Sequence, residues 1–236
     1  LEGPDLSSVE RGEVELLAKV QSQITRQMVW TWLWHYYKDG IFQADPHLGN
    51  IILLKDGRLG LVDFGIMGNS GSPWENYHLA NFSKAATEGL SQKAVEHFRK
   101  FMQDTDLRPE NLISSSFTWR NKTPARIAKG ITQFLEDKLG AIIIQWGGKV
   151  GDVAETRNKR STARYFISLV SLARRFGMEL PLNTLAFIRA MVIADMVCLV
   201  LNPQFNMKEE MRLFFLEHPE VWKAPEVAVA QLSKVS

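Results

Sequence analysis

One stretch decides both the fold and the candidate chemistry. It reads Gln43-Ala44-Asp45-Pro46-His47-Leu48-Gly49-Asn50-Ile51-Ile52-Leu53-Leu54-Lys55-Asp56-Gly57-Arg58-Leu59-Gly60-Leu61-Val62-Asp63-Phe64-Gly65. Two apolar runs, 51–54 and 59–62, flank an Asp-Gly pair, which predicts a β-hairpin with a type I′ turn. Because the hairpin folds the chain back, we expect Asp63 to return beside the loop that carries Asp45 and Asn50.

Two carboxylates and one amide oxygen are thereby predicted to converge on one cleft. Hard oxygen ligands suit Mg²⁺, which keeps several waters and shares substrate phosphates. Asp63 would bind a Mg²⁺ ion that bridges phosphates, and Asn50 would hold a second one. Asp45 would orient the attacking hydroxyl or water, or accept its proton. The spacing of Asp45 and Asn50, followed by a hairpin and Asp63-Phe64-Gly65, is that of a kinase catalytic loop and its D-F-G triplet.

The residues around these ligands are given supporting roles. Gly49 and Gly65 are expected to permit tight backbone turns beside the site. For His47, a hydrogen bond that stabilises the loop is favoured over a side chain that points into the cleft. The alternative for the whole stretch is an exposed hairpin with scattered acids, since Asp-Pro and Asp-Gly pairs alone indicate turns. Three motif elements in the right order favour the site.

Composition sets outer limits on the class of protein. The chain has 236 residues, 45% of them hydrophobic, which allows one large domain or one domain with an appendage. Its net charge of +2 gives no reason to invoke nucleic acid. The single cysteine, Cys198, excludes an internal disulfide and a Cys-rich metal site, and we expect it to be a small buried residue. That fits a reducing compartment.

The start of the chain, Leu1-Glu2-Gly3-Pro4-Asp5, lacks a basic region, an apolar core and an initiator methionine. No signal peptide is predicted, and we expect the chain to be cut from something longer. The most hydrophobic stretch, 185–201, contains Arg189 and Asp195. Two charges near the middle are costly in a bilayer, so a buried core helix is predicted there.

The rest of the pattern is helical, and the predicted fold class is mainly α (α+β). Ser7 and Glu10 match a capping box, and the helix that follows is expected to run to Lys38 and stop at Gly40. Asn206 and Glu209 match a similar start, and Thr123 precedes a proline at a first helical position. Further helices are predicted over 75–103, 124–146, 161–177, 184–201 and 207–217, with a loop over 104–123.

These residues resemble the AarF/UbiB/ADCK atypical kinase family. Its members carry a loop like H-A-D-P-H-P-G-N, then D-G-R, then a D-F-G-like triplet, and here these stand at 43–50, 56–58 and 63–68. Leu1-Glu2-Gly3 resembles the end of the family's hinge, and 185–203 resembles its closing helix. In this sequence Gln43 replaces the usual His and Leu48 replaces the usual Pro, which is expected to tune the site and not to abolish it.

The resemblance implies a protein-kinase-like C-lobe in which a small β-hairpin carries the metal site. It divides the chain into a hinge remnant (1–12), the C-lobe (13–217, with the catalytic and metal loop at 43–68) and a tail (218–236). ATP and Mg²⁺ are the implied cofactors, held by Asn50, Asp63 and Gly65. The implied setting is isoprenoid-lipid metabolism such as ubiquinone biosynthesis, with a lipid or membrane surface as a further implied partner.

No phosphate loop, strand lysine or K-x-G-Q motif is found in the sequence, so the amino-terminal lobe is expected to be a missing partner from the same protein. Without that lobe we expect poor ATP turnover. The alternatives are a non-catalytic pseudokinase-like scaffold or lipid-binding module, and a small-molecule kinase of the aminoglycoside or choline kinase type. A basic cluster, Arg157, Lys159, Arg160 and Arg164, is interpreted as a solvated face, with contact to anionic lipid as the alternative.

Overall fold

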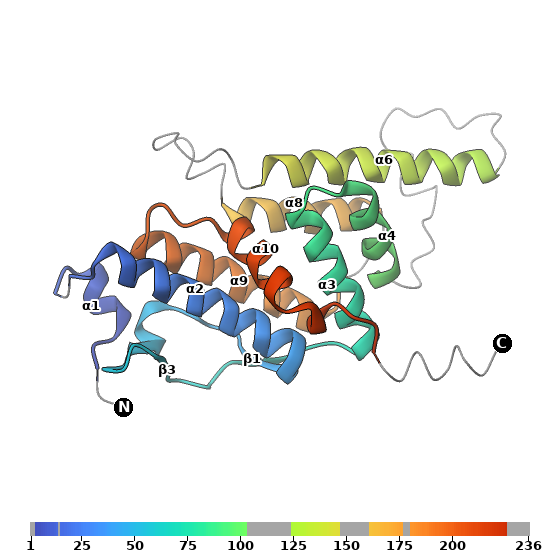
Figure 1. Ribbon diagram of the computed structural model, residues 1–236. Helices are drawn as coiled ribbons and strands as arrows, with labels where there is room; N and C mark the ends of the chain where they lie inside the picture. The colour runs from blue at the N-terminus through green and yellow to red at the C-terminus, as the bar shows by residue number, and fades with distance from the viewer. Residues whose placement is uncertain (1–2, 14, 103–123, 147–160, 177–179, 226–236) are drawn as a thin grey trace.

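The computed structural model describes residues 3–13, 15–102, 124–146, 161–176 and 180–225, and of residues 124–129 and 131 it describes the backbone. This part of the chain is mostly helical and contains two small antiparallel sheets of two strands each. In Figure 1, α6 and α8 run along the upper edge, α2 and α9 cross the middle, and the strands lie along the lower edge. The mainly helical fold class is confirmed.

The elements have the following bounds. The helices are α1 (Leu6–Glu10), α2 (Ala18–Trp34), α3 (Pro73–Thr87), α4 (Ser91–Phe101), α6 (Pro124–Gln145), α8 (Thr162–Arg175), α9 (Leu182–Leu201) and α10 (Met207–Glu217), with a π-helical turn η1 (His35–Asp39) and 3-10 turns η2 (Leu48–Asn50) and η3 (Pro219–Val221). The strands are β1 (Ile41–Gln43), β2 (Ile51–Leu53), β3 (Leu59–Leu61) and β4 (Met67–Asn69). The last four predicted helices agree with α6, α8, α9 and α10 to within two residues.

The first predicted helix is wrong in its start and in its cap. The chain forms the short helix α1, and α2 begins only at Ala18. The N-cap is Asp5, whose Oδ1 accepts hydrogen bonds from the Ser8 N–H (2.9 Å) and the Ser7 hydroxyl (2.6 Å). Since a carboxylate two residues earlier already takes the cap, Ser7 lies inside the first turn. The stop is confirmed, because Gly40 adopts the left-handed conformation with φ 77°.

The predicted helix over 75–103 is two helices. α3 begins with a capping box between Ser72 and Glu75 and ends at Thr87. Gly89 then takes a left-handed conformation (φ 75°), and α4 turns back to pack on α3. The apolar spacing continues through this break, so periodicity alone could not show it. The glycine was the signal that the prediction overlooked.

The core lies between α2, α3, α9 and α10. Phe187 of α9 stacks on Tyr36 with ring centroids 3.8 Å apart, and it meets Phe42 of β1 at 5.6 Å. Buried aromatic side chains of this size each stabilise the fold by roughly 1.5–3 kcal/mol. The N-terminal half of α9 is therefore fixed against the strand that leads into the candidate loop.

α9 is the most apolar helix of the described part. Its length and its mean hydropathy of 2.2 would allow it to cross a membrane, although half of that window is buried within the fold. Cys198 is fully buried, as predicted. Asp195 is also buried, and its Oδ2 accepts a hydrogen bond from the Thr162 N–H (3.0 Å), so it caps α8 from a neighbouring helix. Both observations agree with the predicted core helix.

The predicted hairpin is present as β2 and β3, but its turn type is wrong. Ile51 pairs with Leu61, and Leu53 pairs with Leu59. Gly57 has φ 82°, whereas Asp56 does not have a positive φ, so the turn is type I followed by a left-handed glycine. The carboxylate of Asp56 accepts hydrogen bonds from the backbone and the guanidinium of Arg58, which favours this conformation.

The second sheet, β1 with β4, was not predicted. Gln43 pairs with Met67 at its inner end. β4 has three residues and few apolar side chains, so no sequence pattern indicates a strand there. It is a strand because it pairs with β1. The predicted loop over 104–123, the cap at Thr123, and Arg157, Lys159 and Arg160 lie outside the described residues. Arg164 is described and exposed.

Candidate functional site

Backbone hydrogen bonds bring the two motif segments together. The Val62 N–H donates to the Asn50 carbonyl (2.9 Å), just beyond the β2–β3 pairing. The Ala44 N–H donates to the Ile66 carbonyl (2.9 Å), just beyond the β1–β4 pairing. Asp45, Asn50 and Asp63 each lie within one residue of such a link. The structure therefore gathers all three predicted residues where the two small sheets meet, which we call the sheet junction (residues 43–50 and 62–67).

Asn50 is the most enclosed of the three. Its residue is 6% exposed, and its Nδ2 donates to the Asp45 carbonyl at 3.2 Å. The same residue closes the turn η2, because its N–H donates to the His47 carbonyl (2.9 Å). Since the amide nitrogen is used by the loop, the acceptor oxygen Oδ1 is left for a cation or a water.

Asp63 carries the backbone strain of the junction. Among the described residues, Asp63 is the one non-glycine residue with a positive φ, which is 61°. Such a conformation costs about 1 kcal/mol and is typical of functional sites. Its Oδ1 accepts a hydrogen bond from the Gly65 N–H (3.0 Å), and a Cβ at Gly65 would lie 3.0 Å from that oxygen. Gly49 lies in the 3-10 turn η2 and Gly65 in the bend that follows Asp63, as predicted, but neither has a positive φ.

Asp45 lies between two basic side chains. Its side chain is 27% exposed, with one oxygen 3.9 Å from His47 Nε2 and the other 3.8 Å from Arg189 Nη2. The expectation that the His47 side chain hydrogen-bonds the loop is wrong. That side chain is 52% exposed and faces the Asp45 carboxylate, and it is the backbone of His47 that bonds within the loop.

Gln43 is a site residue that the sequence reasoning noticed without giving it a role. It is 2% exposed, and its Nε2 donates to the carbonyl of Asp63 at 3.1 Å. Its own carbonyl accepts a hydrogen bond from the Trp32 indole N–H (2.7 Å). Gln43 thus connects the buried face of α2 to the strained residue. Its Oε1 has no hydrogen-bond partner in the described part of the chain.

The donor set at the junction fits Mg²⁺. It consists of two carboxylates and an amide oxygen, and the unpartnered Gln43 Oε1 adds a buried acceptor beside them. Among the described residues, no group of three or more His, Cys, Asp or Glu side chains forms a metal cluster. A set this lean suits a cation that keeps most of its waters and shares the oxygens of a bound phosphate.

A separate cavity of about 500 Å³ lies between the end of α6 and the start of α8. Its walls are formed by Ile142, Ile144, Gln145, Trp146, Ser161, Arg164, Tyr165 and Ser168. None of the junction residues contributes to it.

The mainly helical fold with its two small sheets fits a kinase-like domain. The family model of the ABC1 atypical kinase-like domain matches residues 6–98, which include the whole junction. This match agrees with the resemblance to the AarF/UbiB/ADCK family that the motifs indicated.

Curated relatives agree with this assignment. An uncharacterized chloroplastic aarF domain-containing protein kinase of Arabidopsis thaliana is 23% identical over 73% of this chain and 31% of its own length. The chloroplastic protein Activity of BC1 complex kinase 1 of the same plant is 25% identical over 72% of this chain and 21% of its own length. An uncharacterized Synechocystis protein is 44% identical over 22% of this chain and 13% of its own length. The chain spans about a third or less of the length of these relatives.

Proposed function

We propose that this chain provides the Mg²⁺-holding part of an atypical kinase or ATPase of the UbiB type. One observation carries the proposal: the backbone bonds from Val62 to Asn50 and from Ala44 to Ile66 hold the segments that carry Asp45, Asn50 and Asp63 together at the sheet junction. A solvated hairpin has no need of a strained aspartate or of a buried glutamine that holds it. Both features support a ligand site.

The roles of the residues follow from their contacts. Asp63 and Asn50 would hold Mg²⁺ on the phosphates of ATP, with Gly65 fixing one oxygen of Asp63 through its N–H. The bound metal would neutralise charge that develops on the transferred phosphoryl group. The Asp45 carboxylate has its basic neighbours at 3.8 and 3.9 Å, beyond hydrogen-bond range. It would orient the attacking hydroxyl or water, or accept its proton.

The acceptor belongs to the proposal as well. Family resemblance points to isoprenoid-lipid metabolism of the ubiquinone kind, at or near a membrane surface. The coordination chemistry of the junction is independent of that link, so the two parts of the proposal can be tested apart.

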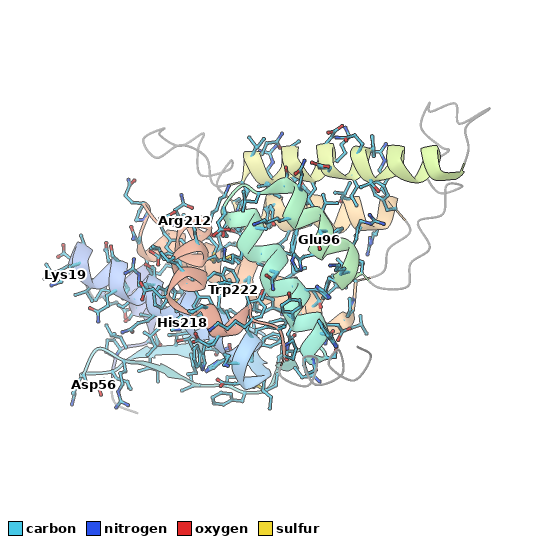
Figure 2. The ribbon with its side chains drawn as sticks, turned by 45° about the vertical axis from the view of Figure 1, so that its right-hand side comes forward. Lys19, Asp56, Glu96, Arg212, His218 and Trp222 are labelled. Atoms are coloured by element: carbon cyan, nitrogen blue, oxygen red, sulfur yellow. The ribbon has the colours of Figure 1, made fainter. Side chains whose placement is uncertain are left out.

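Binding of Mn²⁺, followed by electron paramagnetic resonance with and without ATP, tests the metal chemistry. Asp63→Asn keeps a side chain that tolerates the left-handed conformation and removes the charge. We expect it to weaken Mn²⁺·ATP binding by at least about 100-fold (~2.7 kcal/mol), since the charged carboxylate ligand of the metal is lost. Asp56→Asn is the matched control, because Asp56 lies at the outer end of the hairpin (Figure 2).

If the two variants bind Mn²⁺·ATP equally well, the junction is not the metal site. If the unaltered chain binds neither Mn²⁺ nor Mn²⁺·ATP, the alternative of a non-catalytic scaffold or lipid-binding module gains the support that this proposal loses.

A further inference from the structure

One charged side chain of α9, that of Arg189, has no structural role within the helical fold. The 20 residues of α9, Leu182–Leu201, contain two charged side chains, Arg189 and Asp195. Asp195 is used inside the fold, where it caps α8. Arg189 is instead directed at the sheet junction, 144 positions away along the chain, and its Nη2 lies 3.8 Å from Asp45 Oδ1.

The position of Arg189 is set by rigid packing. Phe187, two residues earlier, is 4% exposed and stacks on Tyr36. Ala190 and Met191, which follow, are fully buried. The guanidinium therefore projects from a helix that is held on both sides of it, which is the arrangement that a binding residue needs.

The contact of Arg189 with Asp45 is longer than the ion pairs of three other arginines in the described part of the chain. Arg26, Arg58 and Arg212 close on their carboxylate partners at 2.9, 2.7 and 2.7 Å. Arg189 stays at 3.8 Å, which is beyond hydrogen-bond range, and its side chain is 58% exposed. An exposed pair at this distance contributes little to stability. Its guanidinium donors remain available for another oxygen acceptor next to Asp45.

We infer that Arg189 binds phosphoryl oxygens at the junction, either those of the terminal phosphate of a nucleotide or those of a free phosphate. A planar guanidinium can donate two parallel hydrogen bonds to such oxygens. His47 faces the other oxygen of Asp45 at 3.9 Å, so the carboxylate is flanked by basic groups on both sides. The inference rests on the proposed function, because it places the phosphate at the same metal site.

Arg189→Gln tests it by electron paramagnetic resonance of Mn²⁺, because the effects on metal and on phosphate differ in sign. We expect the affinity for Mn²⁺ alone to stay the same or to rise two- to threefold, since a nearby cation is removed. We expect the affinity for Mn²⁺·ATP to fall about tenfold, with Arg189→Lys in between because it keeps the charge and loses the fork. Arg212→Gln, which removes the same charge from α10 (Figure 2), should change neither.

Two further arms separate the sources of the phosphoryl oxygens. If the terminal phosphate of the nucleotide is bound, Arg189→Gln weakens Mn²⁺·ATP more than Mn²⁺·ADP. If a free phosphate is bound, the variant instead loses the binding of inorganic phosphate to the Mn²⁺·ADP complex. Either result supports the inference.

The inference is overturned if Arg189→Gln leaves all phosphate binding unchanged, if Arg212→Gln weakens it as much, or if Mn²⁺ alone is lost in parallel. If the unaltered chain and Asp63→Asn bind Mn²⁺ equally, or if neither binds it, the proposed function and this inference both fail.

Discussion

Asp195 and Asp63 are two carboxylates that the same chain uses in opposite ways. Asp195 lies in the helical body, by which we mean helices α2 to α10 of the described residues. It is 2% exposed and accepts a hydrogen bond from the Thr162 N–H. Asp63 lies at the sheet junction, is exposed, and adopts a left-handed backbone that side chains rarely take. The first arrangement stabilises the fold, and the second maintains a conformation that the fold does not need. The difference supports the junction as the candidate site.

Neighbouring groups show the same contrast. Around Asp195, Trp146 donates to the hydroxyl of Thr162 (3.5 Å), so polar groups are paired with one another. Around Asp63, the Oε1 of Gln43 is buried without a partner in the described residues, and Arg189 stops short of Asp45. The helical body is therefore expected to respond to mutation in stability, and the junction in ligand binding.

The largest effect on stability is expected at Asp195. Asp195→Ala leaves the Thr162 N–H buried without its acceptor and opens a small cavity, which should cost about 2–4 kcal/mol. Urea denaturation should show a lower midpoint at an unchanged slope. Mn²⁺ binding should be unaffected below the transition. A variant that kept its stability and lost Mn²⁺ would reverse the roles assigned to the two aspartates.

Acid should act on the helical body through two opposing groups. Burial raises the pKa of Asp195 from 3.8 to about 6, so the cost of its buried charge disappears as pH falls from 6 to 4. Burial and the neighbouring His97 lower the pKa of His78 from 6.5 to about 4, so stability that is complete above pH 6.5 is lost as pH falls toward 4. The Nδ1 atoms of the two histidines are 3.1 Å apart.

Asp195→Asn cannot be protonated, so it lacks the stability that Asp195 gains when its buried carboxylate is protonated at low pH. It should therefore lose roughly 1–2 kcal/mol more than the unaltered chain between pH 7 and 4, a value reduced for partial solvent screening. Thermal unfolding across that range measures it. Changing both His78 and His97 to Gln should flatten the acid loss. Equal pH profiles for all these variants would contradict the assignment.

Gln43 is expected to affect both properties, because it connects the two regions. Gln43→Leu keeps the bulk and removes the donor to the Asp63 carbonyl. We expect a loss of about 1 kcal/mol in stability and about tenfold in Mn²⁺ affinity, as Asp63 is no longer held in place. Isothermal titration calorimetry and urea denaturation measure the two. Unchanged Mn²⁺ affinity would show that the hydrogen bond from Gln43 has no influence on the site.

Two glycines give the smallest and most selective contrast. Gly57→Ala should cost about 1 kcal/mol of stability and leave Mn²⁺ binding alone, because Gly57 needs φ 82° but a Cβ added there would meet no atom within 4 Å. Gly65→Ala should leave stability within about 0.5 kcal/mol and weaken Mn²⁺ binding, because its Cβ would press on Asp63 Oδ1. Urea denaturation and Mn²⁺ titration of both variants measure the contrast. The reverse pattern would contradict the division between the two regions.

Much of the fold could be predicted because its signals are local. The helices from 124 onward and the hairpin follow from periodicity and from the Asp-Gly pair. The errors fall where a neighbouring group changes a local preference: Asp5 takes the cap from Ser7, and Arg58 draws Asp56 into a different turn. The break at Gly89 was missed because the apolar pattern continues across it.

The candidate site could be predicted only in part. The proximity of Asp45, Asn50 and Asp63 could be predicted because one hairpin joins their segments. The strain at Asp63, the hydrogen bond from Gln43 and the approach of Arg189 depend on pairing between β1 and β4 and on the packing of α9. Those contacts join residues far apart in the sequence, so no local pattern records them.

The location of the bound metal tests the central claim most directly. Mn²⁺ added at well below one equivalent broadens the backbone amide signals of nearby residues in a ¹H–¹⁵N spectrum. We expect the amides of residues 44–50 and 62–66 to broaden first and to recover when excess Mg²⁺ is added. Broadening that begins at His78 and His97, or that affects other exposed carboxylates without reaching the junction, would contradict the account.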